Sequence, residues 1–151
     1  MTCIIATDGM MAADSRITGY HIGACIKLFT HKGSIFGTAG DAVTGAAFED
    51  WLRKGALTKN RAEYVKLFES QDVSFAALEM AHNGTIAIWE YPWIRIPIES
   101  PIYAIGSGGA YALGAYSAGA DLEECVRIAA RWDEGCDTNV QLITLADAGG
   151  E

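Results

Sequence analysis

The first segment of the chain is Thr2-Cys3-Ile4-Ile5-Ala6-Thr7-Asp8-Gly9-Met10-Met11-Ala12-Ala13, in which two apolar runs flank a turn signal. An Asp-Gly dipeptide reaches the positive φ angles of a tight turn at low cost, so the two runs are expected to pair as antiparallel strands. Both alternations of each run are apolar, which is typical of strands that are covered on two faces. The segment therefore predicts a hairpin that lies between two layers.

Thr2 follows the initiator methionine directly. A side chain as small as threonine permits removal of Met1, after which Thr2 carries a hydroxyl and a free α-amine on one carbon. The α-amine has a reference pKa of about 7.7 to 8.0, so near neutral pH part of it is uncharged and accepts the hydroxyl proton. Thr2 is therefore a candidate nucleophile with its own base, and the plain alternative is an edge strand that begins with threonine.

The composition limits the classes of partner. With 151 residues, half of them hydrophobic, the chain fits a single domain over residues 1–151 with a real core. It has 11 Lys and Arg against 19 Asp and Glu, and this net charge of -8 repels polyphosphate, so no nucleic-acid partner is expected. Apolar stretches end well short of the roughly 18 residues that a membrane span needs, so no membrane association is expected.

Potential metal ligands are scattered along the chain: the cysteines Cys3, Cys25, Cys125 and Cys136, and the histidines His21, His31 and His82. None of the spacings is typical of a zinc site, so we expect neither a metal nor another cofactor. No signal-peptide pattern precedes the cysteines, and they are interpreted as reduced thiols of a cytoplasmic protein.

Periodicity and turn signals predict the other elements. A second hairpin is expected around Asn83-Gly84, with further strands near 34–37, 102–105 and 140–145. The predicted helices cover 41–54, about 61–69 with a cap at Asn60, 108–119 and 121–131. Residues 91–97 are interpreted as an exposed arm, and the four tryptophans as core or interface residues. Strands and helices in this order predict an α+β layered domain.

Five segments in this order resemble the N-terminal-threonine peptidases, namely proteasome β-subunits and bacterial HslV. They are residues 2–18, 23–28 with Lys27, 37–42 with Gly40, 104–112 with Ser107, and 131–140 with Asp133 and Cys136. The resemblance implies the four-layer αββα sandwich of the N-terminal nucleophile (Ntn) hydrolases. Between residues 55 and 75 the chain is shorter than the family, which has a long second helix there that builds subunit and partner contacts.

The resemblance also implies the catalytic roles. Lys27 beside Thr2 would favour the uncharged amine and the developing alkoxide, and Asp14 would hold Lys27 in place. The backbone N–H of Gly40 would bind the oxyanion, because glycine permits close approach of the scissile carbonyl. Ser107 would hydrogen-bond the Thr2 amine and relay a proton.

Supporting and substrate-binding residues follow from the same alignment. Asp133 and Cys136 would support the Thr2 amine, although a thiol donates hydrogen bonds more weakly than the serine of the family. Asp137 fills the aspartate role in an alternative alignment. Thr18 and Gly40 would flank the bound peptide as an added strand. Thr38 would face the pocket for the residue before the cleaved bond, where a small or apolar preference is expected.

The implied function is a threonine-type endopeptidase that acts in a closed homo-oligomeric ring and receives unfolded polypeptide from a separate ATP-dependent unfoldase. Two alternatives stay open. One is an Ntn amidohydrolase that acts on a small molecule. The other is a non-catalytic ring or scaffold protein that retains Met1. The number of subunits, the ATPase and the cleavage preference are not determined by the sequence.

Overall fold

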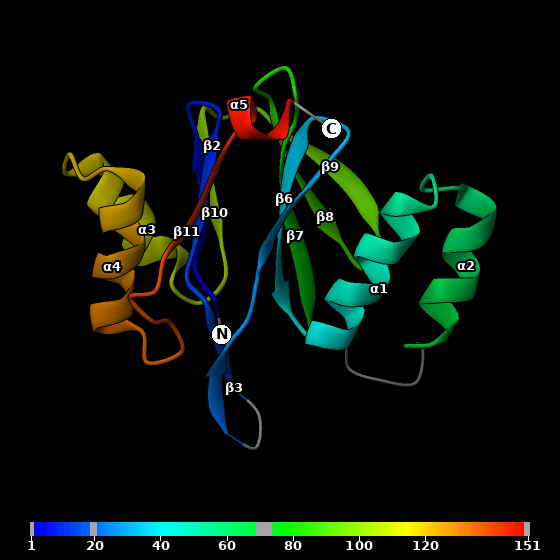
Figure 1. Cartoon of the computed structure of the whole chain (residues 1–151), viewed down its shortest axis with the longest axis horizontal. Helices are drawn as coiled ribbons and strands as arrows, with labels where there is room; N and C mark the ends of the chain where they lie inside the picture. The colour runs from blue at the N-terminus through cyan, green and yellow to red at the C-terminus, as the bar shows by residue number, and fades with distance from the viewer. Residues whose placement is uncertain (1, 19–20, 69–73, 150–151) are drawn as a thin grey trace.

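The structure is a computed structural model that describes residues 2–18, 21–68 and 74–149. Two antiparallel sheets lie face to face, and helices cover the outer side of each (Figure 1). The first sheet has the strand order β10 (Ile102–Ile105), β1 (Ile4–Thr7), β2 (Met10–Ala13), β11 (Gln141–Thr144). The second has the order β5 (Leu28–His31), β6 (Ser34–Gly40), β7 (Phe75–Met80), β8 (Ile86–Glu90), β9 (Ile94–Ile98).

The helices form the two outer layers. Helices α3 (Gly109–Ser117) and α4 (Leu122–Trp132) cover the first sheet, and α1 (Ala42–Arg53) and α2 (Thr58–Lys66) lie beyond the second (Figure 1). The short α5 (Leu145–Ala148) follows β11. This arrangement confirms the predicted α+β, four-layer αββα sandwich. None of the helices in the described ranges is long and apolar enough to cross a membrane.

The predicted N-terminal hairpin lies in the middle of the first sheet. Asp8 and Gly9 both have positive φ, and Ile4 pairs with Ala13. Every residue of β1 is buried. Ile4 belongs to the core between the sheets, whereas Ile5 belongs to the core beneath α3 and α4. The two apolar alternations of the strand therefore serve two different cores.

The core beneath α1 is aromatic and includes Trp93, which lies in the segment that was expected to form an exposed arm. Phe48 of α1 packs against Trp51, Trp89 and Trp93, with ring centroids 5.4 to 6.0 Å away. Trp93 is completely buried. Residues 94–97 are exposed as predicted, but the segment is not an arm, because these residues belong to β9, which pairs with β8.

Two local predictions also differ from the structure. The cap of α2 is Leu57, which makes no side-chain cap hydrogen bond, and Asn60 lies inside the helix. The predicted end of this helix near residue 69 falls outside the described residues. Trp132 is exposed at the end of α4, so of the two predicted roles, core or interface, the core role is wrong.

A separate two-stranded ribbon stands apart from both sheets. It consists of β3 (Arg16–Thr18) and β4 (Ile22–Ala24), and it extends away from the edge of the sandwich (Figure 1). Cys25 N–H donates to Ser15 C=O at 2.7 Å where the ribbon joins the first sheet. The ribbon thus connects the end of β2 to the segment that contains Lys27, which leads directly into β5.

Candidate active site

Thr2 lies at the start of the central strand pair and is only 5% exposed. Its carbonyl accepts a hydrogen bond from Gly108 N–H at 3.0 Å, and its backbone N–H lies 3.4 Å from Ser107 Oγ. Gly106 has φ +89°, and a Cβ at this position would lie 2.1 Å from the Thr2 carbonyl oxygen. A glycine is therefore required for the loop before α3 to fold against the backbone of Thr2.

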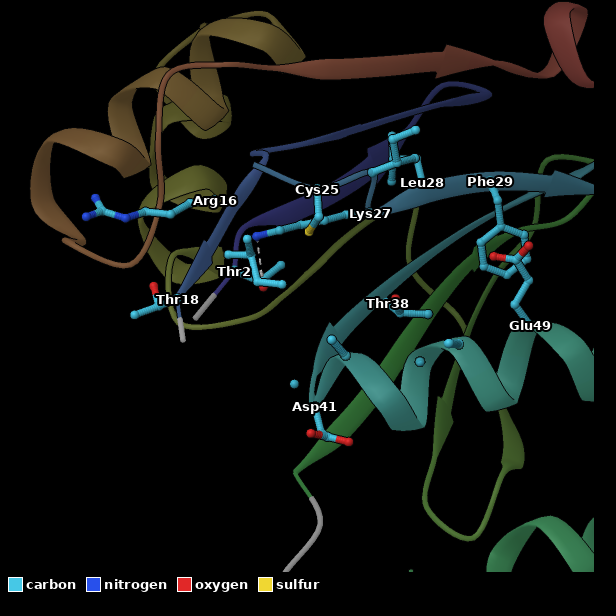
Figure 2. Close-up of a pocket in the computed structure, with 16 residues that line it drawn as sticks. Thr2, Arg16, Thr18, Cys25, Lys27, Leu28, Phe29, Thr38, Asp41 and Glu49 are labelled. Carbon is cyan, nitrogen blue, oxygen red and sulfur yellow. Dashed lines mark hydrogen bonds between the residues drawn. The ribbon is translucent and has the colours of Figure 1, made fainter. Parts of the chain in front are cut away.

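Lys27 lies between Thr2 and Asp14. Its Nζ donates to Thr2 Oγ1 at 3.1 Å and to Asp14 Oδ1 at 2.8 Å. Figure 2 shows the lysine side chain directed at Thr2. Lys27 is 6% exposed and Asp14 is completely buried, so the two charges interact with little screening by solvent.

The carboxylate of Asp14 is held by four donors. Oδ1 accepts from Lys27 Nζ and from Cys3 N–H at 3.0 Å. Oδ2 accepts from Arg16 N–H at 3.1 Å and from Asp137 N–H at 3.3 Å. Because a carboxylate has about four acceptor sites, this set satisfies the side chain and fixes its orientation toward Lys27.

Asp133 and Cys136 lie beside Ser107. Asp133 Oδ1 accepts from Gly135 N–H at 2.8 Å, whereas Oδ2 is buried and accepts no hydrogen bond of standard geometry within the described residues. Burial acts to raise the pKa of Asp133, but the Ser107 hydroxyl, the Gly135 amide and the Cys136 thiol together lower it below its usual value.

The Cys136 thiol is almost fully buried. Burial, together with the nearby charges of Asp14 and Asp133, raises its pKa well above that of a free thiol. Burial and Asp14 likewise raise the pKa of Cys3 to about 12. Because the thiolate is the reactive form of cysteine, the raised pKa makes both thiols unreactive near neutral pH.

Two clefts meet at Thr2 and Gly40. The larger, of about 620 Å³, is lined by Thr18 and Thr38, and the smaller, of about 310 Å³, by Ser107 and residues of β6 and β7. In Figure 2, Thr18 lies on one side of Thr2 and Thr38 on the other. All three predicted substrate-binding residues therefore line one cleft together with Thr2.

Gly40 ends β6 with φ +102°, and a Cβ here would lie 2.0 Å from the Ser74 carbonyl oxygen. Besides Lys27, the larger cleft is lined by three charged residues, Arg16, Asp41 and Glu49. Glu49 was not expected because it lies on the amphipathic helix α1, and its charge is paired with Arg53 at 2.9 Å.

No protein-family model matches the sequence, and no curated protein matches it significantly. Solved structures do match. Eukaryotic HslV from Trypanosoma brucei has 18% identity and a TM-score of 0.67, over 94% of this chain and 97% of that chain. The BPH protein of Thiobacillus denitrificans, in complex with epoxomicin, has 20% identity and a TM-score of 0.64, over 95% and 98%. The Anbu complex of Pseudomonas aeruginosa, a helical assembly, has 16% identity and a TM-score of 0.65, over 95% and 80%.

The chain has the proteasome-β-like Ntn-hydrolase fold. Within this Ntn-hydrolase fold, the structure brings Thr2, Asp14, Lys27 and Ser107 into one connected group. The carboxylate of Asp137 is directed at another part of the site, where it accepts from Ser15 N–H at 2.9 Å. The backbone N–H of Asp137 donates to Asp14. Asp133, rather than Asp137, is therefore the carboxylate beside Ser107.

Two further side chains at this site, Ser15 and Gln141, were given no role by the sequence analysis. Ser15 Oγ donates to Asn139 C=O at 2.7 Å and accepts from Gln141 Nε2 at 2.8 Å. Gln141 in turn reaches the backbone of Lys27. The only sequence signal for Gln141 is a carboxamide at the start of an otherwise apolar predicted strand. Among the described residues, no group of three His, Cys, Asp or Glu is arranged to hold a metal ion.

Proposed function

We propose that this protein is a threonine-type endopeptidase with Thr2 as its N-terminal nucleophile. The observation that carries the proposal is the pair of contacts from Lys27 Nζ to Thr2 Oγ1 and to Asp14 Oδ1, buried where two clefts meet. A cation beside a hydroxyl favours the alkoxide, and it also favours the uncharged form of a neighbouring amine. The clefts on either side of Thr2 suit a peptide that continues in both directions.

The reaction begins after removal of Met1. The Thr2 α-amine accepts the hydroxyl proton while Oγ1 attacks the scissile carbonyl, and Lys27 stabilises the negative charge on Oγ1. The Gly40 N–H donates to the oxyanion. The Thr2 ammonium then gives its proton to the departing amine, which leaves an ester on Thr2. A water molecule, deprotonated by the same amine, hydrolyses the ester and restores the hydroxyl. Ser107 and Asp133 orient the amine throughout.

We further propose a self-compartmentalising homo-oligomer, served by an ATP-dependent unfoldase, in a reducing compartment such as the cytoplasm. Val43 of α1 and Tyr111 of α3 are exposed apolar residues on the helices expected to face neighbouring subunits. The Anbu relative forms a helical assembly. All four cysteines are free, as expected for a reducing environment. Light scattering coupled to gel filtration tests the assembly, and a strict monomer at micromolar concentration would remove this part of the proposal.

The test of the chemistry combines intact mass, hydrolysis of fluorogenic peptides and labelling by epoxomicin, whose epoxyketone reacts with a hydroxyl and an amine on one residue. We expect the mass of residues 2–151, peptide hydrolysis, and a label on Thr2. Thr2→Ala should abolish both activities, and Thr2→Ser should retain part.

The other outcomes separate the alternatives. Trimmed protein that neither cleaves peptides nor takes the label would overturn the proposal. Hydrolysis of small amides but not of peptides would indicate an amidohydrolase. Protein that retains Met1 and is inactive would indicate a non-catalytic scaffold, whereas full activity from protein that retains Met1 would contradict the mechanism itself.

A further inference from the structure

We infer that Gln141 is a positioning residue, which holds the backbone of Lys27 so that its ammonium reaches Thr2 and Asp14. The inference rests on the function proposed above, because it gives Lys27 its catalytic importance. Gln141 itself is not among the described residues that line the two clefts, but it hydrogen-bonds the backbone of the lining residues Cys25, Lys27 and Leu28. Its effect on the chemistry must therefore pass through Lys27.

The carboxamide of Gln141 uses its full hydrogen-bonding capacity. Oε1 accepts from Lys27 N–H at 2.9 Å and from Leu28 N–H at 3.3 Å. Nε2 donates to Ser15 Oγ and to Cys25 C=O, both at 2.8 Å. Two donors and two acceptors are the inventory of a neutral amide, so the partners also define which end of the side chain is oxygen and which is nitrogen.

The location of Gln141 explains why such a clamp is needed. It begins β11, an edge strand of the first sheet, and Lys27 lies just before β5, an edge strand of the second. Lys27 is thus on a connection between the sheets rather than within a ladder. Its N–H is held by Gln141 from the first sheet, and its C=O accepts from Thr38 N–H of the second sheet at 3.2 Å.

The same carboxamide joins the two charged partners. Through Ser15 Oγ it is tied to the end of β2, where Asp14 lies, and through Lys27 N–H to the residue that bonds Asp14. A displacement of about 1 Å in a catalytic group can lower the rate by about 10²-fold. Loss of this clamp should therefore lower kcat and leave KM nearly unchanged.

The test uses two substitutions at Gln141. Gln141→Glu keeps the shape but cannot donate, and it sets a carboxylate oxygen against the Cys25 carbonyl. Gln141→Met keeps the length and removes every hydrogen bond of the carboxamide, including a longer one of 3.4 Å from Nε2 to Asp14 C=O, without adding charge. Thr144→Ala is the matched control in the same strand, because it removes the side-chain cap of α5 and leaves the Lys27 connection intact.

For peptide hydrolysis by trimmed protein, we expect kcat to fall by about 10- to 100-fold in both Gln141 variants, with KM within about twofold of the wild type. Thr144→Ala should keep the wild-type kcat at a comparable loss of thermal stability. Trace acetylation followed by mass spectrometry should label Lys27 several-fold faster in the Gln141 variants than in the wild type or in Thr144→Ala.

The labelling measurement separates the two proposals. If the wild type has no peptidase activity, the proposed function fails, and the Lys27 labelling rate still decides whether Gln141 holds Lys27. Unchanged Lys27 labelling in a folded Gln141→Met variant would overturn the positioning role whether or not the protein is active. In an active protein, the positioning role would also be overturned if the Gln141 variants lowered kcat no more than Thr144→Ala does.

Discussion

Lys27 and Asp14 form a buried ion pair, with 2.8 Å between Nζ and Oδ1. A buried ion pair is costly to break from one side, because the remaining charge loses its partner in a place that water does not reach. Here the pair is tied to Thr2 by the second hydrogen bond of Lys27. Substitution of either residue is therefore expected to lower both the stability and the activity of the protein, by different amounts at the two positions.

Lys27→Ala should lower peptide hydrolysis by at least about 10²-fold, because Thr2 loses the cation that stabilises its alkoxide. The free energy of unfolding should fall by about 3 kcal/mol, the lower end for a broken buried pair, since three backbone N–H groups still bind Asp14. Fluorogenic peptide cleavage and urea unfolding measure both, with the exposed Lys32→Ala as control. Cleavage at the wild-type rate would contradict the electrostatic role.

Asp14→Asn should be more harmful to stability than Lys27→Ala, by about 4 to 5 kcal/mol relative to wild type. All four partners of Asp14 are donors, so the NH2 group of asparagine would face a donor. The positive charge of Lys27 would also stay buried without its carboxylate partner. Urea unfolding of the two variants side by side gives the order. The opposite order would show that Lys27, rather than the backbone donors, dominates the energetics of this carboxylate.

Gly106→Ala should destabilise the protein and lower activity, since an alanine at φ +89° is strained and its Cβ would overlap the Thr2 carbonyl. Strain alone is expected to cost about 1 to 3 kcal/mol. Gly114→Ala is the matched control in α3, where an added Cβ meets open space. It should raise stability by about 0.5 to 1 kcal/mol. If chemical denaturation showed that both substitutions raise, or both lower, the free energy of unfolding, the assignment of Gly106 to a tight loop would be refuted.

The Asp133 carboxylate should stabilise the protein at neutral pH and cease to do so in acid. Its folded pKa lies below the unfolded value of about 3.9, so the stabilisation is present above that pH and is lost as the pH falls through the folded pKa. The difference in unfolding free energy between wild type and Asp133→Asn should therefore shrink from pH 6 to pH 3. Glu134→Gln, an exposed neighbour, is the control. If this difference in unfolding free energy grew toward pH 3, the folded pKa of Asp133 would lie above the unfolded value, contrary to the prediction.

Local patterns predicted most of the fold because they report local physics. The Asp8-Gly9 turn, the cap at Asp41 and the cap at Asp121 are each formed by neighbours in the sequence. The segment around Trp93 was predicted to be exposed because the burial of this side chain depends on α1, which lies far from it along the chain. Two prolines and an arginine around a tryptophan do not reveal which helix covers it.

The candidate site divides in the same way. Thr2, Lys27 and Ser107 lie in segments that resemble a known family, so their placement could be predicted from the sequence. Gln141 could not, because its importance arises only where an edge strand of one sheet approaches an edge strand of the other. Glu49 was missed for a related reason, since a helix pattern does not indicate which polar residue turns toward a cleft.

The aromatic cluster around Phe48 gives the protein a built-in optical probe. Trp51 and Trp93 are buried there and Trp89 is half-buried, whereas Trp132 is exposed on the opposite outer layer. Intrinsic fluorescence at short wavelength should therefore report the packing of α1 on the second sheet, and the emission of Trp132 should be red-shifted and open to quenching by iodide in the native protein. With Trp132→Phe, the remaining signal would follow the separation of one helical layer from its sheet, independently of events at α4.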